Sequence, residues 1–289
     1  MMKPDYTPLW YWIREREAIR IKKELGMLPP WTGDEILAAY RFCNVRREDD
    51  AVTRWIDTHV RQPYRDHPRL WFMLAICRQI NWPDTIAELI RSGAWPTDDH
   101  FTPAQVTQVL AARRARGNKV YTGAYLIPAP PERGADKQAY VAEVVLGDLW
   151  QRSDEFSAHF AAAPTMQGTH ERLRRSLGWG DFLAYQAVVD MRFSERLLAS
   201  APDRDRWAAA GPGTLRGLNR IHERALVAIP SQAQALDEMR AIYQIAERET
   251  GVSLDFSDVP NVLCETDKYL RVLLGQGKPR AKYVPGRGA

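Results

Sequence analysis

The stretch Gly178-Trp-Gly-Asp-Phe-Leu-Ala-Tyr-Gln-Ala-Val-Val-Asp-Met-Arg-Phe193 decides the fold class. After its two glycines, hydrophobic residues cover almost the whole circumference of a helix, so the pattern predicts a buried α-helix. Hydrophobic residues three and four positions apart recur along the rest of the chain, whereas alternating strand patterns are almost absent. The sequence therefore predicts an all-α fold.

Helix-start sequences precede several of the helical patterns. In such starts a side chain accepts a backbone N–H bond that the first turn leaves unpaired. Thr102-Pro103 places proline at a first helical position, and Gly251 ends the last of these segments. The capping-box spacing occurs at Thr32-Gly-Asp-Glu35, Thr85-Ile-Ala-Glu88 and Ser231-Gln-Ala-Gln234.

The 289 residues, 45% of them hydrophobic, suffice for one unit with two lobes. Residues 117–135 contain several glycines and prolines and form the one long irregular stretch, which we interpret as the connection between the lobes. We expect an N-terminal lobe at residues 1–125, a C-terminal lobe at 136–275 and a basic tail at 276–289.

The composition permits a DNA partner without requiring one, since the net charge is only +4. Few and scattered cysteines and histidines indicate no disulfide framework, no metal site and no cofactor. No segment suits a signal peptide or a membrane span, which fits a cytoplasmic protein, in the host cytoplasm if a phage encodes it. Basic clusters, which are either solvated helix faces or a phosphate-facing surface, occur at Arg113, Arg114, Arg116 and Lys119, at Arg172, Arg174 and Arg175, and at Lys278, Arg280, Lys282 and Arg287.

Two glycine hinges precede helical segments. Gly178 and Gly180 flank a tryptophan, and Gly211 and Gly213 flank a proline. Glycine lets the backbone approach a ligand, and a helix start presents free amides and a positive dipole end to an anion. The first hinge resembles the hairpin with which helix-hairpin-helix DNA glycosylases hold a DNA phosphate; tight helix packing is the alternative.

The second hinge is followed by Arg216 and Arg220, one helical turn apart. Such a pair is suited to clamp a phosphate or pyrophosphate. The alternative is a capped helix start with two solvated arginines.

Polar residues inside the buried helix form the next candidate. Gln186 and Asp190 are four positions apart and share a face. A buried carboxylate needs partners or a shifted pKa, so Asp190 is either a functional base or a structural aspartate bonded to a neighbour.

A third candidate is Leu263-Cys-Glu-Thr-Asp-Lys-Tyr-Leu-Arg271, which contains Glu265, Asp267, Lys268 and Arg271. Spacing alone favours ordinary ion pairs on a helix surface, worth about 0.3–0.5 kcal/mol each. Further upstream, Asn44, Arg47 and Asp50 either line a cleft or lie on the surface.

Taken in order, these stretches resemble the α-glutamyl/putrescinyl-thymine pyrophosphorylase family and the related helical domain of 5-hydroxymethyluracil DNA kinases. The resemblance extends from about Tyr11 to Arg271. It is carried by Tyr40–Asp49, Tyr121–Tyr125, Gly178–Gln186 with Asp190, Gly211–Gly217 and Leu263–Tyr269.

The resemblance implies an all-α fold like that of DNA glycosylases and a role in hypermodifying thymine in bacteriophage DNA. A P-loop DNA kinase would act upstream and activate 5-hydroxymethyluracil as a pyrophosphate ester, and the family enzyme would replace the pyrophosphate with an amino acid or polyamine donor. These 289 residues contain no GxxxxGK[ST] motif, which disfavours the kinase step for this chain. Asp203 and Asp205, rather than Asp190, lie near the position of the glycosylase aspartate.

We expect the thymine derivative to be flipped out of the DNA stack. Gly178 and Gly180 would hold DNA, while Gly211, Gly213, Arg216, Arg220, Lys268 and Arg271 are the candidates for binding phosphate or pyrophosphate. Asp190 is the first choice of base, and Glu265 or Asp267 the second. Asn44, Gln186 and Tyr185 would contact the base ring, and Arg47 would bind a donor carboxylate. The alternatives are a DNA glycosylase and a non-catalytic DNA-binding partner of a kinase.

Overall fold

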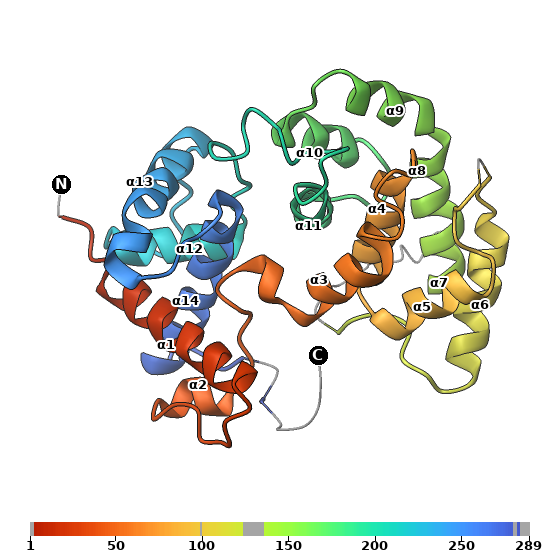
Figure 1. Cartoon of the computed structure of the whole chain (residues 1–289). Coiled ribbons are helices and arrows are strands. Elements are labelled where there is room, and N and C mark those ends of the chain that lie inside the picture. The colour runs from red at the N-terminus through yellow and green to blue at the C-terminus, as the bar shows by residue number, and fades with distance from the viewer. Residues whose placement is uncertain (1–2, 99, 124–135, 280–281, 284–289) are drawn as a thin grey trace. The chain divides into compact units, whose positions relative to one another are not determined.

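The computed structural model describes residues 3–98, 100–123, 136–279 and 282–283. This part of the chain is helical (Figure 1). The β structure within it is an isolated antiparallel bridge between Tyr40 and Lys282. The all-α prediction is confirmed. None of the helices described there is long and apolar enough to cross a membrane.

The chain divides into two compact units, which are not consecutive lobes. Unit 1 combines residues 1–51 with residues 205–289, and unit 2 contains residues 52–204. The expected division into residues 1–125 and 136–275 therefore differs from the observed one, because the chain returns to its N-terminal helices after residue 204. Residues 124–135 of the expected connection, with Tyr125, and the basic tail residues Arg280 and Arg287 lie outside the described residues.

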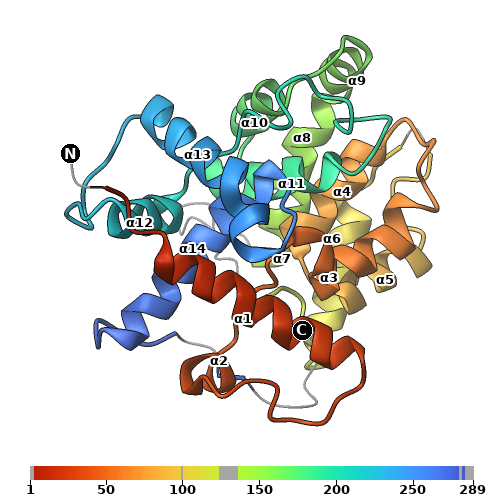
Figure 2. The ribbon, with the colours of Figure 1, turned by 60° about the vertical axis from the view of Figure 1, so that its left-hand side comes forward.

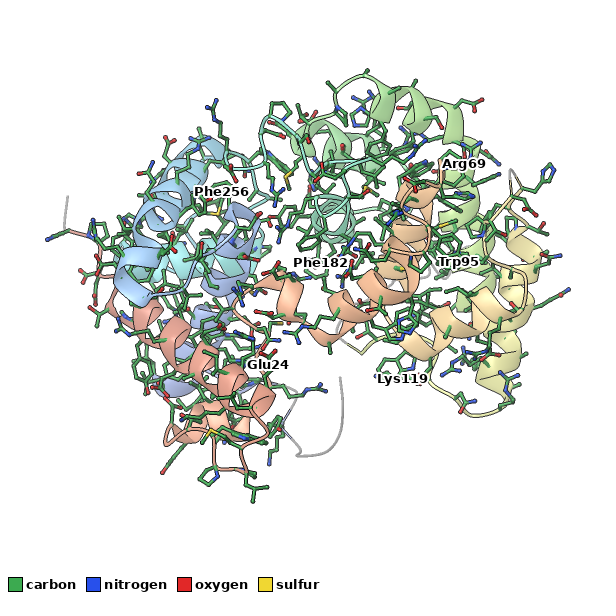
Figure 3. All side chains as sticks on the ribbon, in the orientation of Figure 1. Glu24, Arg69, Trp95, Lys119, Phe182 and Phe256 are labelled. Carbon is green, nitrogen blue, oxygen red and sulfur yellow. The ribbon has the colours of Figure 1, made fainter. Side chains whose placement is uncertain are left out.

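Unit 1 is built around the last helix of the chain. Figures 1 and 2 both show α1 alongside α14, and the two helices are in contact. Phe256, labelled in Figure 3, is fully buried in this unit. The helices of unit 1 are α1 (Thr7–Glu24), α2 (Glu35–Ala39), α12 (Pro212–Ile221), α13 (Gln232–Thr250) and α14 (Val259–Leu273), with short 3₁₀ turns η1 (Arg47–Asp49) and η5 (Phe256–Asp258).

Unit 2 packs around two buried helices. Every residue of α4 is buried, and so is every residue of α11 from Leu183 to Met191, which confirms the predicted buried helix. Trp71 of α4 stacks on Phe156 with ring centres 4.4 Å apart. The elements of unit 2 are α3 (Ala51–Ile56), whose first residue is counted to unit 1, the π-helix η2 (Asp57–Arg61), α4 (Leu70–Ile80), α5 (Pro83–Arg91), α6 (Pro103–Ala115), α7 (Lys137–Ala139), the π-helix η4 (Tyr140–Leu146), α8 (Gly147–Gln151), α9 (Ser153–Ala161), α10 (Met166–Arg174) and α11 (Asp181–Met191).

The helix starts follow the predicted signals in part. Ser231 caps α13 by accepting the amide of Gln234, and Gly251 ends that helix in the left-handed conformation. Thr102 precedes α6 with Pro103 in its first turn. The other two predicted starts were wrong. Asp34 rather than Thr32 caps α2, and α5 begins at Pro83, so that Thr85 lies inside the helix and donates to the Val120 carbonyl.

The closest helix contact in unit 1 is between α12 and α14. A Cβ atom built on Gly217 would lie 2.5 Å from the Leu263 carbonyl oxygen. At Gly213 it would lie 2.3 Å from the Cys264 sulfur. Only glycine at these positions lets the two helices approach so closely, and this contact sets which α12 side chains reach α14.

We expect Gly217→Ala to destabilise the protein by about 1–3 kcal/mol, because the added methyl group meets backbone rather than a movable side chain. Helix propensity alone predicts the opposite sign, since alanine favours helix over glycine by about 1 kcal/mol. Denaturant unfolding measures the difference. Gly33→Ala is the matched control, because that Cβ would meet open space. Equal stability of Gly217→Ala and the wild type would contradict the packing role.

Candidate functional site

One side of α14 carries a continuous row of polar side chains. A helix turns about 100° per residue, so Asn261, Cys264, Glu265 and Lys268 form one stripe. Asp267 and Arg271 lie along one edge of that stripe, next to Cys264. We call these six residues the α14 polar face.

The first edge of the α14 polar face is an arginine cluster. The Asp267 carboxylate is fully buried and accepts bonds from the Nε atoms of Arg216 at 2.9 Å and Arg220 at 2.8 Å. Arg271 Nε lies 3.5 Å from the same carboxylate. Asp267 is the only carboxylate within ion-pair distance of these three guanidinium groups in the part of the chain described. The cluster therefore carries an excess of positive charge.

The exposure of the three arginines differs. The side chains of Arg216 and Arg271 are 36% and 38% exposed, whereas that of Arg220 is 9% exposed. Arg220 also donates to the Gln276 side chain at 2.7 Å. Arg216 and Arg271 are thus oriented by Asp267 and still open to solvent, which suits them to bind an anion.

The opposite edge of the α14 polar face meets residues 42–44. Glu265 accepts the Cys43 amide at 2.9 Å and pairs with Lys268 Nζ at 2.5 Å. Asn261 donates to the Asn44 carbonyl at 3.0 Å. Lys268 also lies over the Phe42 ring, 4.7 Å from its centre. Segments more than two hundred positions apart in the sequence therefore form one surface.

Asn44 and Arg47 have different surroundings. The Asn44 side chain donates to the Asp49 carbonyl at 2.7 Å and accepts a bond from Arg16 at 2.5 Å. The Arg47 amide donates to Asp258 at 2.8 Å, and its guanidinium lies 3.5 Å from Asp50. Arg47 is therefore engaged inside the protein, which weakens its assignment to a donor carboxylate.

The Cys264 thiol lies at the centre of the α14 polar face, against Gly213 of α12. Burial, followed by the charge of Glu265, raises the pKa of Cys264 to about 11. Burial also raises the pKa of Cys43. Both thiols are consequently protonated at neutral pH, which argues against a thiolate nucleophile at this site.

The first-choice base, Asp190, lies in unit 2. It is fully buried, and Arg78 binds both of its oxygens, with Nη2 at 2.6 Å from Oδ1 and Nε bonded to Oδ2. Arg78 is itself held by Thr53 at 2.8 Å and Asn81 at 3.0 Å. Because both oxygens of Asp190 are held, the geometry favours a structural role for Asp190 over a role as the catalytic base.

Other predicted residues of unit 2 are also enclosed or engaged in structural bonds. Tyr185 and Gln186 are 7% and 8% exposed, so neither offers an open stacking surface. Asp203, near the glycosylase position, accepts the amides of Met166 at 2.7 Å and Gln167 at 2.9 Å. Asp203 therefore holds the start of α10 and has a structural role of its own.

The two glycine hinges are built differently. At Gly178 the backbone is left-handed, with φ +77°, and a Cβ atom would lie 2.5 Å from Val145. Gly180 is the N-cap of α11, whereas in the other hinge the N-cap of α12 is the first glycine, Gly211. Each hinge thus has one packing glycine and one open N-cap glycine, in opposite order. They also belong to different units.

The start of α11 is exposed and apolar. Leu177 is 46% exposed, and Phe182, which is labelled in Figure 3, is 56% exposed. Arg174 pairs with Asp181 at 2.6 Å, which places an acidic group at the same helix start. An acidic residue in the first turn competes with an external anion for the helix dipole. By contrast, the first turn of α12 contains no acidic residue.

Acidic partners bind arginines of two predicted basic clusters. Arg113 and Arg116 both bind Glu88, the first at 2.9 Å, and Arg172 binds Glu155 at 2.5 Å. Because these arginines are engaged in ion pairs, the two clusters are better interpreted as ordinary helix faces than as phosphate-facing surfaces.

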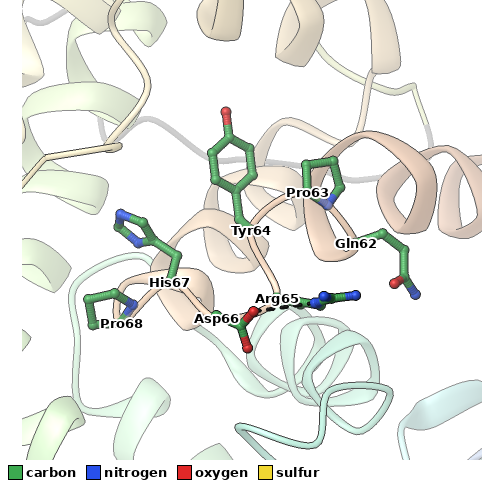
Figure 4. Close-up of a pocket in the computed structure, with 7 residues that line it drawn as sticks. All are labelled: Gln62, Pro63, Tyr64, Arg65, Asp66, His67 and Pro68. Carbon is green, nitrogen blue, oxygen red and sulfur yellow. Dashed lines mark hydrogen bonds and ion pairs between the residues drawn. The ribbon is translucent and has the colours of Figure 1, made fainter.

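The structure also has an open hollow of about 480 Å³, formed by the consecutive residues Gln62 to Pro68 (Figure 4). It contains none of the predicted site residues, and Arg65 and Asp66 pair within it at 3.3 Å. Within the described residues, no three His, Cys, Asp or Glu side chains are grouped as metal ligands. The α14 polar face remains the candidate site.

The structure defines an all-α protein with a polar helix face that is bordered by an arginine cluster. A family model described as "5-hmdU DNA kinase, helical domain" matches residues 4–278, so the chain belongs to this family. A 5-hmdU DNA kinase of Bacillus phage SP10 is 26% identical over 230 residues, which are 72% of this chain and 35% of the kinase. The chain thus spans about a third of that relative's length. No solved structure matches.

These matches confirm the part of the resemblance that concerns the kinase helical domain. The likeness to the pyrophosphorylase family and to DNA glycosylases stays a prediction.

We expect Asp190→Asn to destabilise the protein by about 3–5 kcal/mol, because it leaves the buried Arg78 guanidinium without a charged partner. Denaturant unfolding tests this, with Asp66→Asn as the control, since the Asp66 side chain is 90% exposed. A stable Asp190→Asn protein that lost only a chemical activity would instead restore Asp190 as the base.

Proposed function

We propose that this protein acts in thymine hypermodification of DNA. It transfers an amino acid or amine onto the 5-methylene of pyrophosphate-activated 5-hydroxymethyluracil and releases pyrophosphate. Family membership supports the DNA-modification context. The arginine cluster around Asp267 is the observation that carries the reaction, because it offers oriented cations, two of which are more than a third exposed.

The reaction requires three events. The amine lone pair forms a C–N bond to the methylene carbon, and the C–O bond to pyrophosphate breaks with its electrons leaving on oxygen. The ammonium proton is lost to a base. Developing negative charge on the leaving group is stabilised by preorganised cations and amides, for which Arg216, Arg271 and the first turn of α12 are the candidates.

Glu265 is the base that the geometry favours. Asp190 is enclosed by Arg78, and Asp267 is occupied by three arginines. Glu265 is buried at the edge of the α14 polar face that meets residues 42–44, and Lys268 is its single cationic partner within the described residues. Proton transfer between Glu265 and an incoming amine requires displacement of that lysine, and the Cys43 amide also donates to Glu265 Oε2.

The DNA substrate and an upstream P-loop kinase are part of this proposal. The kinase chemistry is assigned to a separate domain or protein, since these residues lack the phosphate-binding loop motif. The target base would leave the DNA stack to reach the site.

Mass analysis of nucleosides tests the reaction. The protein is incubated with pyrophosphorylated 5-hydroxymethyluracil DNA and a mixture of amino acids and polyamines, and the DNA is then digested. We expect a nucleoside whose mass equals the donor joined to thymidine. Abasic sites would indicate a glycosylase instead. Salt-sensitive DNA binding without any product would indicate a non-catalytic module.

We expect Arg216→Ala to lower turnover by about 10²–10³-fold, as the loss of one preorganised donor to a leaving group does. The dissociation constant for DNA should change by less than about threefold, since a single phosphate contact contributes little to the total. Single-turnover kinetics and DNA titration measure the two effects. Arg248→Ala is the control, because Arg248 is 73% exposed and pairs with its neighbour Glu249. Equal losses in turnover and binding would refute a leaving-group role.

A further inference from the structure

Arg16 of α1 is a cation that the sequence patterns did not single out. Its Nε donates to the Cys43 carbonyl at 3.0 Å, and its Nη2 donates to Asn44 Oδ1 at 2.5 Å. These bonds attach the guanidinium to the same segment that meets Glu265 and Asn261 of the α14 polar face. Arg16 is thereby fixed beside the candidate site.

The remaining nitrogen of Arg16, Nη1, is buried and lacks a hydrogen-bond acceptor within the described residues. The groups that Arg16 binds are neutral oxygens, and the carboxylates of Asp50, Glu265 and Glu17 act on its guanidinium through space without an ion pair within 4 Å in the described residues. A buried guanidinium without an ion-pair partner is costly, and an unmet buried donor adds to that cost. Burial accordingly lowers the pKa of Arg16.

We propose that Arg16 binds the carboxylate of a free amino acid, and that the donor of the transfer reaction is therefore an amino acid rather than a polyamine. This inference rests on the proposed function. The incoming carboxylate would supply the missing charge partner and accept the Nη1 bond. Asn44 and the Cys43 carbonyl hold the guanidinium in place, so little ordering is needed on binding.

The burial of Nη1 favours a small carboxylate over a DNA phosphate. A free amino acid presents one small carboxylate, whereas a phosphodiester carries bulky sugars on both sides. The phosphate-binding role suits Arg216 and Arg271, whose side chains are more than a third exposed. Carboxylate and pyrophosphate would then be bound at opposite edges of the α14 polar face, with Glu265 and Lys268 belonging to the edge that meets residues 42–44.

Binding without DNA tests Arg16 separately from the reaction. Each of the twenty standard amino acids and L-ornithine is titrated into the full chain and observed by ligand NMR, with putrescine and methylamine as the matched amines of ornithine and glycine. We expect at least one amino acid to bind and its decarboxylated counterpart not to bind. Arg16→Gln should lower the affinity for that amino acid by at least tenfold. Arg14→Gln is the control on the same helix, because Arg14 is exposed and donates to the Glu249 carbonyl at 2.9 Å.

Arg16→Lys should recover part of the affinity, because it restores the charge without the planar fork. The proposal is overturned if no amino acid binds the wild type, or if Arg16→Gln binds it as well as Arg14→Gln does. It is also overturned if Arg16→Gln weakens DNA binding and reduces its salt dependence by about one phosphate contact, since Arg16 would then bind phosphate. Amino acid binding that depends on Arg16, without any transfer product, would reject the proposed reaction and leave the carboxylate site standing.

Discussion

The close contact of α12 with α14 is the constraint on which the candidate site depends. Gly217 lies against the Leu263 carbonyl and Gly213 against the Cys264 thiol, with no room for a side chain at either position. At this separation Arg216 and Arg220, one turn apart on α12, both reach the single carboxylate of Asp267. A wider spacing would leave Asp267 buried with fewer partners, which is unfavourable for a charge. By setting the distance between α12 and α14, the two glycines determine which arginines reach the Asp267 carboxylate.

Two fully buried aspartates have similar chemistry and different consequences. Asp190 is bound by Arg78, whose side chain is 3% exposed, so this pair is enclosed and joins α4 to α11. Asp267 is bound by three arginines, two of which remain over a third exposed. One carboxylate therefore stabilises packing and the other orients cations toward solvent. The number and exposure of the partners, rather than the burial of the carboxylate, distinguish the two roles.

Local patterns predicted much of the fold and little of the site's assembly. The buried helix α11 follows from an apolar run that covers every side, and the start and end of α13 follow from Ser231 and Gly251, since these effects act within a few residues. The start of α5 was mispredicted because Pro83 precedes the apparent capping box at Thr85. The two-unit division depends on contacts between distant segments, and so do the bonds of Arg78 to Asp190 and of Arg16 to residues 43 and 44. The sequence cannot show such contacts, because an arginine on an amphipathic helix has the same sequence pattern whether it is solvated or enclosed.

The arrangement also bears on which part of the reaction the protein assists most. The carboxylates Asp190, Asp203 and Asp267 hold other protein groups in place, and the proposed base Glu265 itself accepts the Cys43 amide and pairs with one lysine. The cations are more numerous and better oriented than the bases. Pyrophosphate leaves the methylene carbon readily once its charge is neutralised, whereas a neutral amine has one proton to lose after it attacks. A site rich in oriented arginines and poor in free carboxylates is therefore better matched to leaving-group stabilisation than to base catalysis.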